Sequence, residues 1–401
     1  MPVIGNVMNI GIRSAWLKLT EYKAAYVQMF VLSDYGEEWR AQRKLAHAAL
    51  SPSAIMDFVV MQEDIASELA NDLVKTPENF HALIRLAAGR TVISVTYGIQ
   101  PSNVEDELIS ISEEGNRIGQ RAAMPGAHLC DILPILKYAP SWVPFQRAAK
   151  HDRQVIHDLL NKPFDHVKKE MTPPENFTNL DERLKCAAGA MYGAGAETTY
   201  SAVLTFILAM ALSPNKQVLA QAEIDRVVGI DRLPSIEDMP NLPYINAVIK
   251  ETMRWHPSLP LGIPHRSSED DAYKGYFIPK STVVLPNVWA VAFEPNEKYD
   301  PQEFLPDRFL DASQPAVDPS IWVFGFGRRV CPGRFLAENS MFIFIATFLS
   351  AFDIYPPENG EIKAHFKEFI VSVLEPFECR ILPRSEAKAS LVEIRAAQIT
   401  I

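Results

Sequence analysis

Cysteine is scarce in this chain, and the few that occur lie far apart. The 401 residues contain four, with separations of 56, 145 and 48 positions: Cys130, Cys186, Cys331 and Cys379. No two have the spacing of zinc ligands, and four in so long a chain do not make a disulfide framework. This usage fits a reducing compartment or the reducing face of a membrane. Most lone cysteines are small buried hydrophobes, and we expect Cys130, Cys186 and Cys379 to be of this kind.

Positive charge is in deficit. Lys and Arg number 39 against 49 Asp and Glu, so the formal net charge is −10, and the pI is about 5.5. A general nucleic-acid binder carries a basic patch and a high pI, so this composition argues against a nucleic-acid partner. It leaves room for a local basic face toward an acidic partner.

Long apolar runs are few. The N-terminus, MPVIGNVMNI, lacks the basic region and apolar stretch of a signal peptide. Residues 186–212 are long enough to span a membrane, but Glu197 would lie near the middle of the bilayer, where a carboxylate is costly. We therefore interpret this segment as a long buried helix that crosses a core and ends before Ser213-Pro214.

Helical periodicity dominates the rest of the chain. Gly229 is the expected C-cap of a helix that begins near Asn215. The stretch YFIPKSTVVL, residues 276–285, predicts a small hairpin around Pro279-Lys280. Prolines and acidic residues crowd residues 286–319, as in a long irregular segment. The pattern as a whole predicts a mainly α fold with a small β-sheet region.

Cys331 differs from the other cysteines in its surroundings. It lies in FGFGRRVCPG, residues 324–333, where Gly325 and Gly327 permit a sharp turn just before an apolar run that predicts a helix. The N–H groups and positive end of that helix stabilise a thiolate, as do the two arginines just before the cysteine. Such a thiolate can be a nucleophile or a metal ligand. A dinucleotide site is not indicated, because Val330 stands at the third glycine position.

A second chemical candidate is GAGAETTYS, residues 193–201. Glu197 is the only charged residue between Lys185 and Lys216. A carboxylate beside the hydroxyl of Thr198 in apolar surroundings is a functional candidate, because burial perturbs its proton affinity. The alternative is a buried glutamate that only hydrogen-bonds a loop.

Two further motifs carry arginines. In DYGEEWRAQRKLAHAAL, a helix places Arg43 on the apolar stripe beside Trp39, where a buried guanidinium needs an anion. The alternative is an arginine that snorkels from the edge of the stripe. In KETMR, Glu251 and Arg254 are three residues apart on a helix. The apolar stripe of that helix lies on the other side, so periodicity predicts an exposed salt bridge of little worth.

Together these stretches resemble the cytochrome P-450 family of haem-thiolate monooxygenases, in order as well as in content. WRAQRK is similar to the family's C-helix motif, AGAETT to its I-helix motif, and ETMR to its Glu-x-x-Arg. PDRF, residues 306–309, is similar to the segment whose arginine joins that pair, and FGFGRRVCPG fills the cysteine-ligand loop. The resemblance extends from about residue 35 to the C-terminus and is to a fungal, membrane-associated branch. It implies the cytochrome P-450 fold, with haem between the I helix and the cysteine-ligand loop and L helix.

The resemblance implies haem b as the cofactor and Cys331 as the thiolate ligand of its iron, whose electron donation favours O–O cleavage. The residues expected at the haem propionates are Trp39, Arg43, His265 and Arg329. Those expected to bind haem at the ligand loop are Phe324 and Gly333. For His265 the alternative is a solvated loop histidine.

The same resemblance makes Glu251, Arg254 and Arg308 a structural triad that supports the haem loop, against the exposed pair that periodicity predicts. It assigns Glu197 and Thr198 as a catalytic acid–alcohol pair that steers protons to bound O₂.

The implied activity is that of a monooxygenase, which inserts one oxygen atom from O₂ into a small lipophilic substrate in secondary metabolism or xenobiotic oxidation. NADPH would act indirectly, through a reductase that docks on the cysteine side near Arg328 and Arg334. Membrane association at the cytoplasmic face of the endoplasmic reticulum is expected from the family.

The N-terminal region is short. We expect residues 1–34 to be a shortened region without the anchor and most of the β1 and B-helix region, and residues 35–401 to be the haem-binding catalytic domain. Two other functions stay open. One is a haem-thiolate isomerase or dehydratase, against which the acid–alcohol pair argues. The other is a non-catalytic or unstable haem-binding remnant, for which the shortened region argues.

Overall fold

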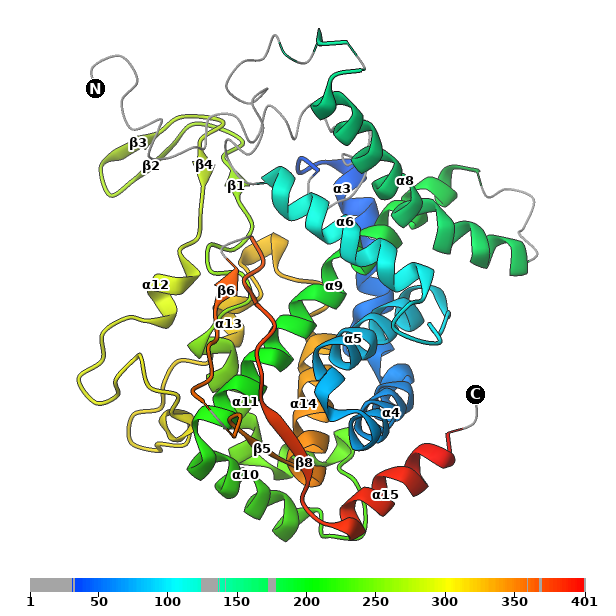
Figure 1. The fold of residues 1–401 in the computed structure, drawn as a ribbon. Helices are drawn as coiled ribbons and strands as arrows, with labels where there is room; N and C mark the ends of the chain where they lie inside the picture. The colour runs from blue at the N-terminus through cyan, green and yellow to red at the C-terminus, as the bar shows by residue number, and fades with distance from the viewer. Residues whose placement is uncertain are drawn as a thin grey trace. The chain divides into compact units, whose positions relative to one another are not determined.

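The computed structural model describes residues 31, 33–123, 136, 138–140, 142–171, 178–358, 360–367 and 370–399. Helices dominate these residues and the strands are short (Figure 1), so the predicted mainly α fold with a small β-sheet region is confirmed. Cys130 and nearly all of the region at residues 1–34 lie outside the described residues.

The helices account for most of the described residues. The α-helices are α3 (Glu37–Leu50), α4 (Val59–Lys75), α5 (Phe80–Tyr97), α6 (Glu107–Ala123), α8 (Pro144–Glu170), α9 (Thr178–Leu212), α10 (Pro214–Val227), α11 (Pro243–Trp255), α12 (Val288–Ala292), α13 (Ser320–Val323), α14 (Arg334–Ala351) and α15 (Glu386–Ala397). Short 3-10 helices are η3 (Ala54–Phe58), η4 (Pro77–Asn79), η6 (Ile236–Asn241), η7 (Pro306–Phe309) and η8 (Gly327–Arg329). The predicted ends of two helices are confirmed: α9 stops before Ser213-Pro214, and Gly229, with φ of 88°, follows α10.

The strands form two-stranded antiparallel sheets. In the described residues the pairs are β1 (His265–Arg266) with β4 (Val283–Val284), β2 (Asp271–Tyr273) with β3 (Tyr276–Ile278), β5 (Phe352–Tyr355) with β8 (Arg380–Pro383), and β6 (Phe366–Lys367) with β7 (Val373–Leu374).

The hairpin predicted at residues 276–285 is wrong. β3 pairs with β2, which precedes it, across Lys274 and Gly275, whose φ angles are 49° and 82°. Two consecutive residues with positive φ are typical of a two-residue hairpin turn. A turn does form at Pro279, whose carbonyl accepts the N–H of Thr282 at 3.1 Å, but it leads from one sheet to another. The glycine after Lys274 was the better hairpin signal, because it adopts positive φ without strain.

The chain divides into two compact units. The first contains the described residues of Met1–Ile65, Ala82–Thr199 and Phe335–Ala337, and the second those of Ala66–His81, Tyr200–Arg334 and Glu338–Ile401. Long helices such as α9 contribute residues to both units.

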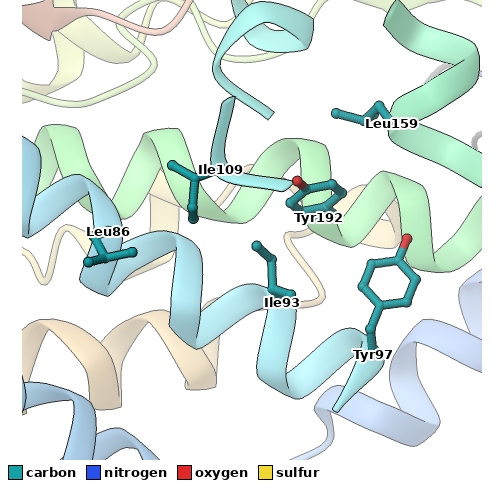
Figure 2. Packing of buried hydrophobic residues seen from close by; sticks show 6 residues of the cluster. All are labelled: Leu86, Ile93, Tyr97, Ile109, Leu159 and Tyr192. Carbon is teal, nitrogen blue, oxygen red and sulfur yellow. The ribbon is translucent and has the colours of Figure 1, made fainter. Parts of the chain in front are cut away.

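A buried cluster joins four helices of the first unit. Six side chains from α5, α6, α8 and α9 gather around one point (Figure 2): Leu86, Ile93, Tyr97, Ile109, Leu159 and Tyr192. Tyr192 donates its hydroxyl to the carbonyl of Leu108 on α6. A Cβ on Gly195 would lie 2.7 Å from Cγ2 of Val92, so the glycine lets α5 approach α9 closely. These contacts fix α5 and α6 against α9.

In the described residues, α9 is the one helix whose length and composition would allow it to cross a membrane. Of the apolar window that meets this criterion, 67% is buried inside the fold. Phe206, Ile207 and Met210 are fully buried. This burial is that of a core helix, as the sequence predicted.

The second unit has its own core around α14. From Met341 to Ala351 this helix is buried on all sides, and Phe342, Phe344 and Ile345 are at most 1% exposed. A helix that is hydrophobic all round is buried in a core. The ring of Phe348 on α14 lies edge to face with that of Phe206, with centroids 6.3 Å apart. The N-terminus of α14, where the cysteine loop ends, therefore belongs to a firmly packed helix.

Candidate functional site

The predicted site residues belong to both units. The first unit holds Trp39, Arg43, Glu197 and Thr198. The second holds Glu251, Arg254, His265, Arg308, Phe324, Arg329, Cys331 and Gly333. Within each unit the structure brings several of them together.

The loop before α14 has the tight turn that its glycines predict. Gly325 and Gly327 have φ angles of 80° and 57°, which a side chain would make strained. The N–H of Cys331 donates to the carbonyl of Phe324 at 2.7 Å, and this bond closes the loop. Gly333 is the N-cap residue of α14. The half-buried Cys331 thus lies two residues before the N-cap of a long helix, as expected.

The position of Cys331 suits a thiolate. Unsatisfied N–H groups and the positive end of the macrodipole lie at a helix N-terminus and favour an anion. Cys186 and Cys379 differ, because burial raises the pKa of each thiol to about 12. Cys186 is buried, as predicted, whereas Cys379 is half-buried. A thiol with so high a pKa stays protonated near neutral pH, and no disulfide links the described cysteines.

His265 and Arg329, both predicted at the haem propionates, are near enough for the charge of Arg329 to act on the imidazole. His265 is on β1, where it pairs with Val284 of β4. Burial lowers the pKa of His265, and the charge of Arg329 lowers it further. A largely neutral imidazole and a guanidinium together offer hydrogen-bond donors and positive charge to an anion such as a carboxylate. A partly buried position at the end of a strand also argues against a freely solvated loop histidine.

Glu251, Arg254 and Arg308 form a buried ion-pair network. Arg254 donates from Nε and Nη2 to the two carboxylate oxygens of Glu251, at 2.8 and 2.9 Å. Arg308 donates from Nε to Glu251 Oε1 at 3.1 Å. Glu251 is 0% exposed, Arg308 4% and Arg254 6%. The structure thus brings together the three residues that the resemblance groups. The exposed pair predicted from periodicity is wrong, because η7 covers that side of α11.

The triad also holds the irregular segment that leads to the cysteine loop. Arg254 donates to the carbonyls of Ala292 and Pro301, each at 3.0 Å. Ala292 packs with Val288 and Trp322 in a small buried cluster. Trp322 belongs to α13, and Phe324 follows that helix directly. The buried charges are therefore connected, through α12 and α13, to the residue whose carbonyl accepts the Cys331 N–H.

Glu197 and Thr198 lie next to each other on α9. The Thr198 hydroxyl donates a hydrogen bond to the carbonyl of Ala194 at 3.1 Å. A hydroxyl that donates in this way can also accept a hydrogen bond through its oxygen. Glu197 forms an ion pair with Arg85 of α5, with Oε2 and Nη1 3.6 Å apart. This partner of Glu197 is a guanidinium on a helix and not a group of a loop.

Arg85 is a residue that the sequence reasoning missed. Its nitrogen Nε also lies 3.5 Å from Oε1 of Glu113 on α6. The signal was present, since Arg85 is a lone charge in the apolar run FHALIRLAA. A charge inside an apolar helical segment needs a partner.

Trp39 and Arg43 occupy the predicted face of α3. Trp39 is 6% exposed and packs with Ala46 and with Ala190 of α9. Arg43 is half-buried one turn further along the same face. Trp39 therefore fixes the face from which Arg43 extends.

The comparisons with known proteins decide the family. A model of the family described as Cytochrome P-450 matches residues 13–379. This chain belongs to the cytochrome P-450 family. It is 36% identical over 392 residues to cytochrome P-450 monooxygenase claR of Ampulloclitocybe clavipes, covering 92% of this chain and 73% of that protein. It is 38% identical over 400 residues to cytochrome P-450 monooxygenase COX2 of Coprinopsis cinerea, covering 92% and 76%.

A third relative, cytochrome P-450 monooxygenase 176 of Postia placenta, is 35% identical over 395 residues, covering 91% of this chain and 76% of that protein. These relatives are fungal monooxygenases, so the P-450 fold and the class of enzyme that the sequence implied are confirmed. The family implies haem as the cofactor. The donor set fits it, because one thiolate at a helix N-terminus is the protein ligand that a haem-thiolate iron takes.

Proposed function

We propose that this P-450 inserts one oxygen atom from O₂ into a small lipophilic substrate, with electrons that an NADPH-dependent reductase supplies. The observation that carries the proposal is the cysteine loop. Cys331 lies half-buried before α14, in a turn that Gly325 and Gly327 permit. That arrangement gives a thiolate suited to hold haem iron. When bound, the haem would supply the oxygen chemistry that amino-acid side chains lack.

The other residues of the second unit would hold the cofactor in place. Arg329 and His265 offer adjacent donors to a propionate, and Phe324 and Gly333 belong to the turn that presents the sulfur. From the first unit, Arg43 would bind propionate as well, since it extends from a face that Trp39 fixes. These roles follow from charge and hydrogen-bonding chemistry.

Glu197 and Thr198 would transfer protons. Thr198 Oγ1 donates to its own helix, so its lone pairs can accept a proton or a water. Glu197 is a mostly buried carboxylate, 13% exposed, next to it. A carboxylate and a hydroxyl side by side can pass a proton from one to the other and recover it from water. The absence of either group would let reduced oxygen leave as peroxide.

Electrons would enter near the cysteine loop. Arg328 is exposed and Arg334 half-buried, on either side of Cys331. Positive charge there would attract an acidic reductase surface even though the whole chain has a net charge of −10. An enzyme with such a partner and a lipophilic substrate would work at the cytoplasmic face of the endoplasmic reticulum.

The test is a reductase-driven assay on the haem-loaded protein. We expect NADPH and O₂ to be consumed together, and only when both the reductase and the P-450 are present. Screening lipophilic compounds should then yield a product carrying one oxygen atom from labelled O₂. A haem-loaded protein that oxidises no NADPH, or that converts a substrate without O₂, would contradict the proposal. The second outcome would indicate an isomerase or dehydratase.

A further inference from the structure

Arg85 lies between two carboxylates of unequal exposure. Its Nη1 is 3.6 Å from Glu197 Oε2, and its Nε is 3.5 Å from Glu113 Oε1. The side chain of Glu197 is 13% exposed, that of Arg85 28% and that of Glu113 44%. All three belong to the first unit. The series therefore leads from a mostly buried carboxylate through a guanidinium to a carboxylate that water reaches.

The backbones that carry these charges are fixed. Arg85 is next to Leu86, and Glu113 is four residues after Ile109, which places it one turn along the same face of α6. Leu86 and Ile109 belong to the buried cluster of the first unit (Figure 2). Gly195, where α5 comes close to α9, is two residues before Glu197 in the chain. The three charges thus face each other because packing holds their helices, and the ion pairs are not needed to bring them together.

We propose that Arg85 is a positioning residue for Glu197. We also propose that Glu113 determines how strongly the Arg85 guanidinium stabilises the ionised Glu197 carboxylate. A guanidinium this close favours the ionised carboxylate and orients it toward α5. Glu113 competes for the same guanidinium and weakens that effect. The inference rests on the proposed function, in which Glu197 gives up and regains a proton. Arg85 and Glu113 would then decide the pH range in which Glu197 can do so.

A purely structural role is the rival explanation. In that case the bridge would only tie α5 to α6 and α9, and its loss would lower stability without changing the proton affinity of Glu197. The two explanations differ in a quantity that needs no turnover, namely the pH at which Glu197 takes up a proton.

The experiment is a pH titration of the haem-loaded protein by infrared spectroscopy, in which the signal of Glu197 is identified by its loss in Glu197→Gln. In Arg85→Gln we expect the midpoint of proton uptake by Glu197 to rise by about one pH unit. Arg85→Lys, which keeps the charge, should restore most of the difference. In Glu113→Gln the midpoint should fall, because Arg85 then no longer shares its charge with the Glu113 carboxylate.

Arg90→Gln is the matched control. Arg90 is on the same helix and donates to the carbonyls of Pro101 and Ser102, each at 2.7 Å. It should leave the midpoint unchanged. The proposal is overturned if Arg85→Gln and Arg90→Gln give the same midpoint, or if Glu113→Gln raises it. If Arg85→Gln does not fold, the midpoint in Glu113→Gln alone tests the proposal, because a change at this exposed side chain should leave folding intact.

A second measurement separates this inference from the proposed function. The pH profile of peroxide release, driven by the reductase, should shift in Arg85→Gln in the same direction as the infrared midpoint. A shifted midpoint without any NADPH oxidation would support Arg85 as the positioning residue and contradict the proposed function. NADPH oxidation with an unshifted midpoint would support the proposed function and contradict Arg85 as the positioning residue.

Discussion

Single residues in this P-450 derive their chemistry from the backbone around them. Thr198 and Thr199 show the difference that one position makes. Both hydroxyls donate to the carbonyl four residues before them on α9, at 3.1 and 3.0 Å. Thr199 is buried at 8% exposure, whereas Thr198 is half-buried beside Glu197. Each hydroxyl donates the same kind of bond to its own helix, so this bond cannot account for a difference in function between them.

Thr198→Ala is therefore expected to uncouple the enzyme. Without the hydroxyl, protons no longer reach the reacting oxygen in order, and product formed per NADPH oxidised should fall by about tenfold or more. Peroxide release should rise correspondingly. Thr199→Ala removes an equivalent hydrogen bond one residue away and should keep coupling close to that of the unchanged chain. Equal coupling in the two variants would count against the acid–alcohol assignment.

Glu251 is the residue whose burial was predicted least well from helical periodicity, since it was expected on an exposed face and is 0% exposed. Its helix has an apolar stripe, and the sequence alone places Glu251 and Arg254 opposite to it. Periodicity predicts which face of a helix is apolar, but it contains no information on which distant segment covers the polar face. Here Arg308, 57 residues away from Glu251, buries the pair. Only the resemblance of the ETMR and PDRF motifs to a known family anticipated the network.

Removing Glu251 should be strongly destabilising. Glu251→Ala leaves two buried guanidinium groups without their carboxylate, which costs about 3–5 kcal/mol in the free energy of unfolding. Arg117→Gln is the control, because Arg117 forms an ion pair with Glu114 but is 59% exposed. That change should cost about 1 kcal/mol or less. Denaturant titration of both variants measures the difference, and similar losses would show that the buried triad has no special role.

At the scale of elements, the loop before α14 depends on glycine conformations. A Cβ on Gly325 would find its nearest neighbour, the carbonyl oxygen of Arg329, at 3.8 Å, and one on Gly327 would meet nothing within 4 Å. Space is therefore available at both positions, and the positive φ angles are the reason for glycine. Gly229, after α10, has the same property with φ of 88° and nothing within 4 Å.

Alanine at each of these glycines should lower the free energy of unfolding by about 1 kcal/mol, through backbone strain alone. Only Gly325→Ala and Gly327→Ala should also weaken haem retention and thiolate ligation, because they alter the turn that presents Cys331. Gly229→Ala should leave both unchanged. Haem release to apomyoglobin, measured beside the unfolding curves, checks this. Faster release from Gly229→Ala would attribute the effect to stability rather than to the loop.

The sequence specified helices better than strands. The limits of α9, α10 and α11 follow from proline and glycine, whose effects on the backbone are local. The pairing of β3 with β2 was missed because a strand of two or three residues has little signal of its own, and its partner lies elsewhere in the chain. Arg85 did have a local signal, as a lone charge in an apolar run, but the sequence did not show its partners, because Glu113 and Glu197 are 28 and 112 residues away from it.

At the scale of the whole molecule, stability should depend on pH through His256. Burial lowers the pKa of His256 to about 4. Its ring stacks on Phe366, and its Nε2 lies 2.8 Å from Ser372 Oγ. The folded chain keeps this imidazole neutral, while the unfolded chain protonates it near the ordinary value of 6.5. The contribution of the neutral His256 to the free energy of unfolding is therefore complete above about pH 6.5 and is lost as the pH falls toward 4.

Between pH 7 and pH 5 this residue should account for a loss of about 2 kcal/mol in the free energy of unfolding. His256→Gln cannot titrate, so its stability should change less over the same range. Denaturant midpoints of both proteins at the two pH values give the comparison. An identical pH dependence in the two proteins would mean that other groups cause it.

We propose that Cys331 provides the thiolate of a haem enzyme, and a carbon monoxide difference spectrum can show whether it does. The haem-loaded chain is reduced and exposed to carbon monoxide, and the difference spectrum is recorded beside those of Cys331→Ala and Cys379→Ala. The unchanged chain and Cys379→Ala should show the red-shifted Soret band of thiolate ligation, and Cys331→Ala should lose it. Retention of that band in Cys331→Ala, or its absence from the unchanged chain with haem bound, would mean that Cys331 is not the thiolate ligand of the iron.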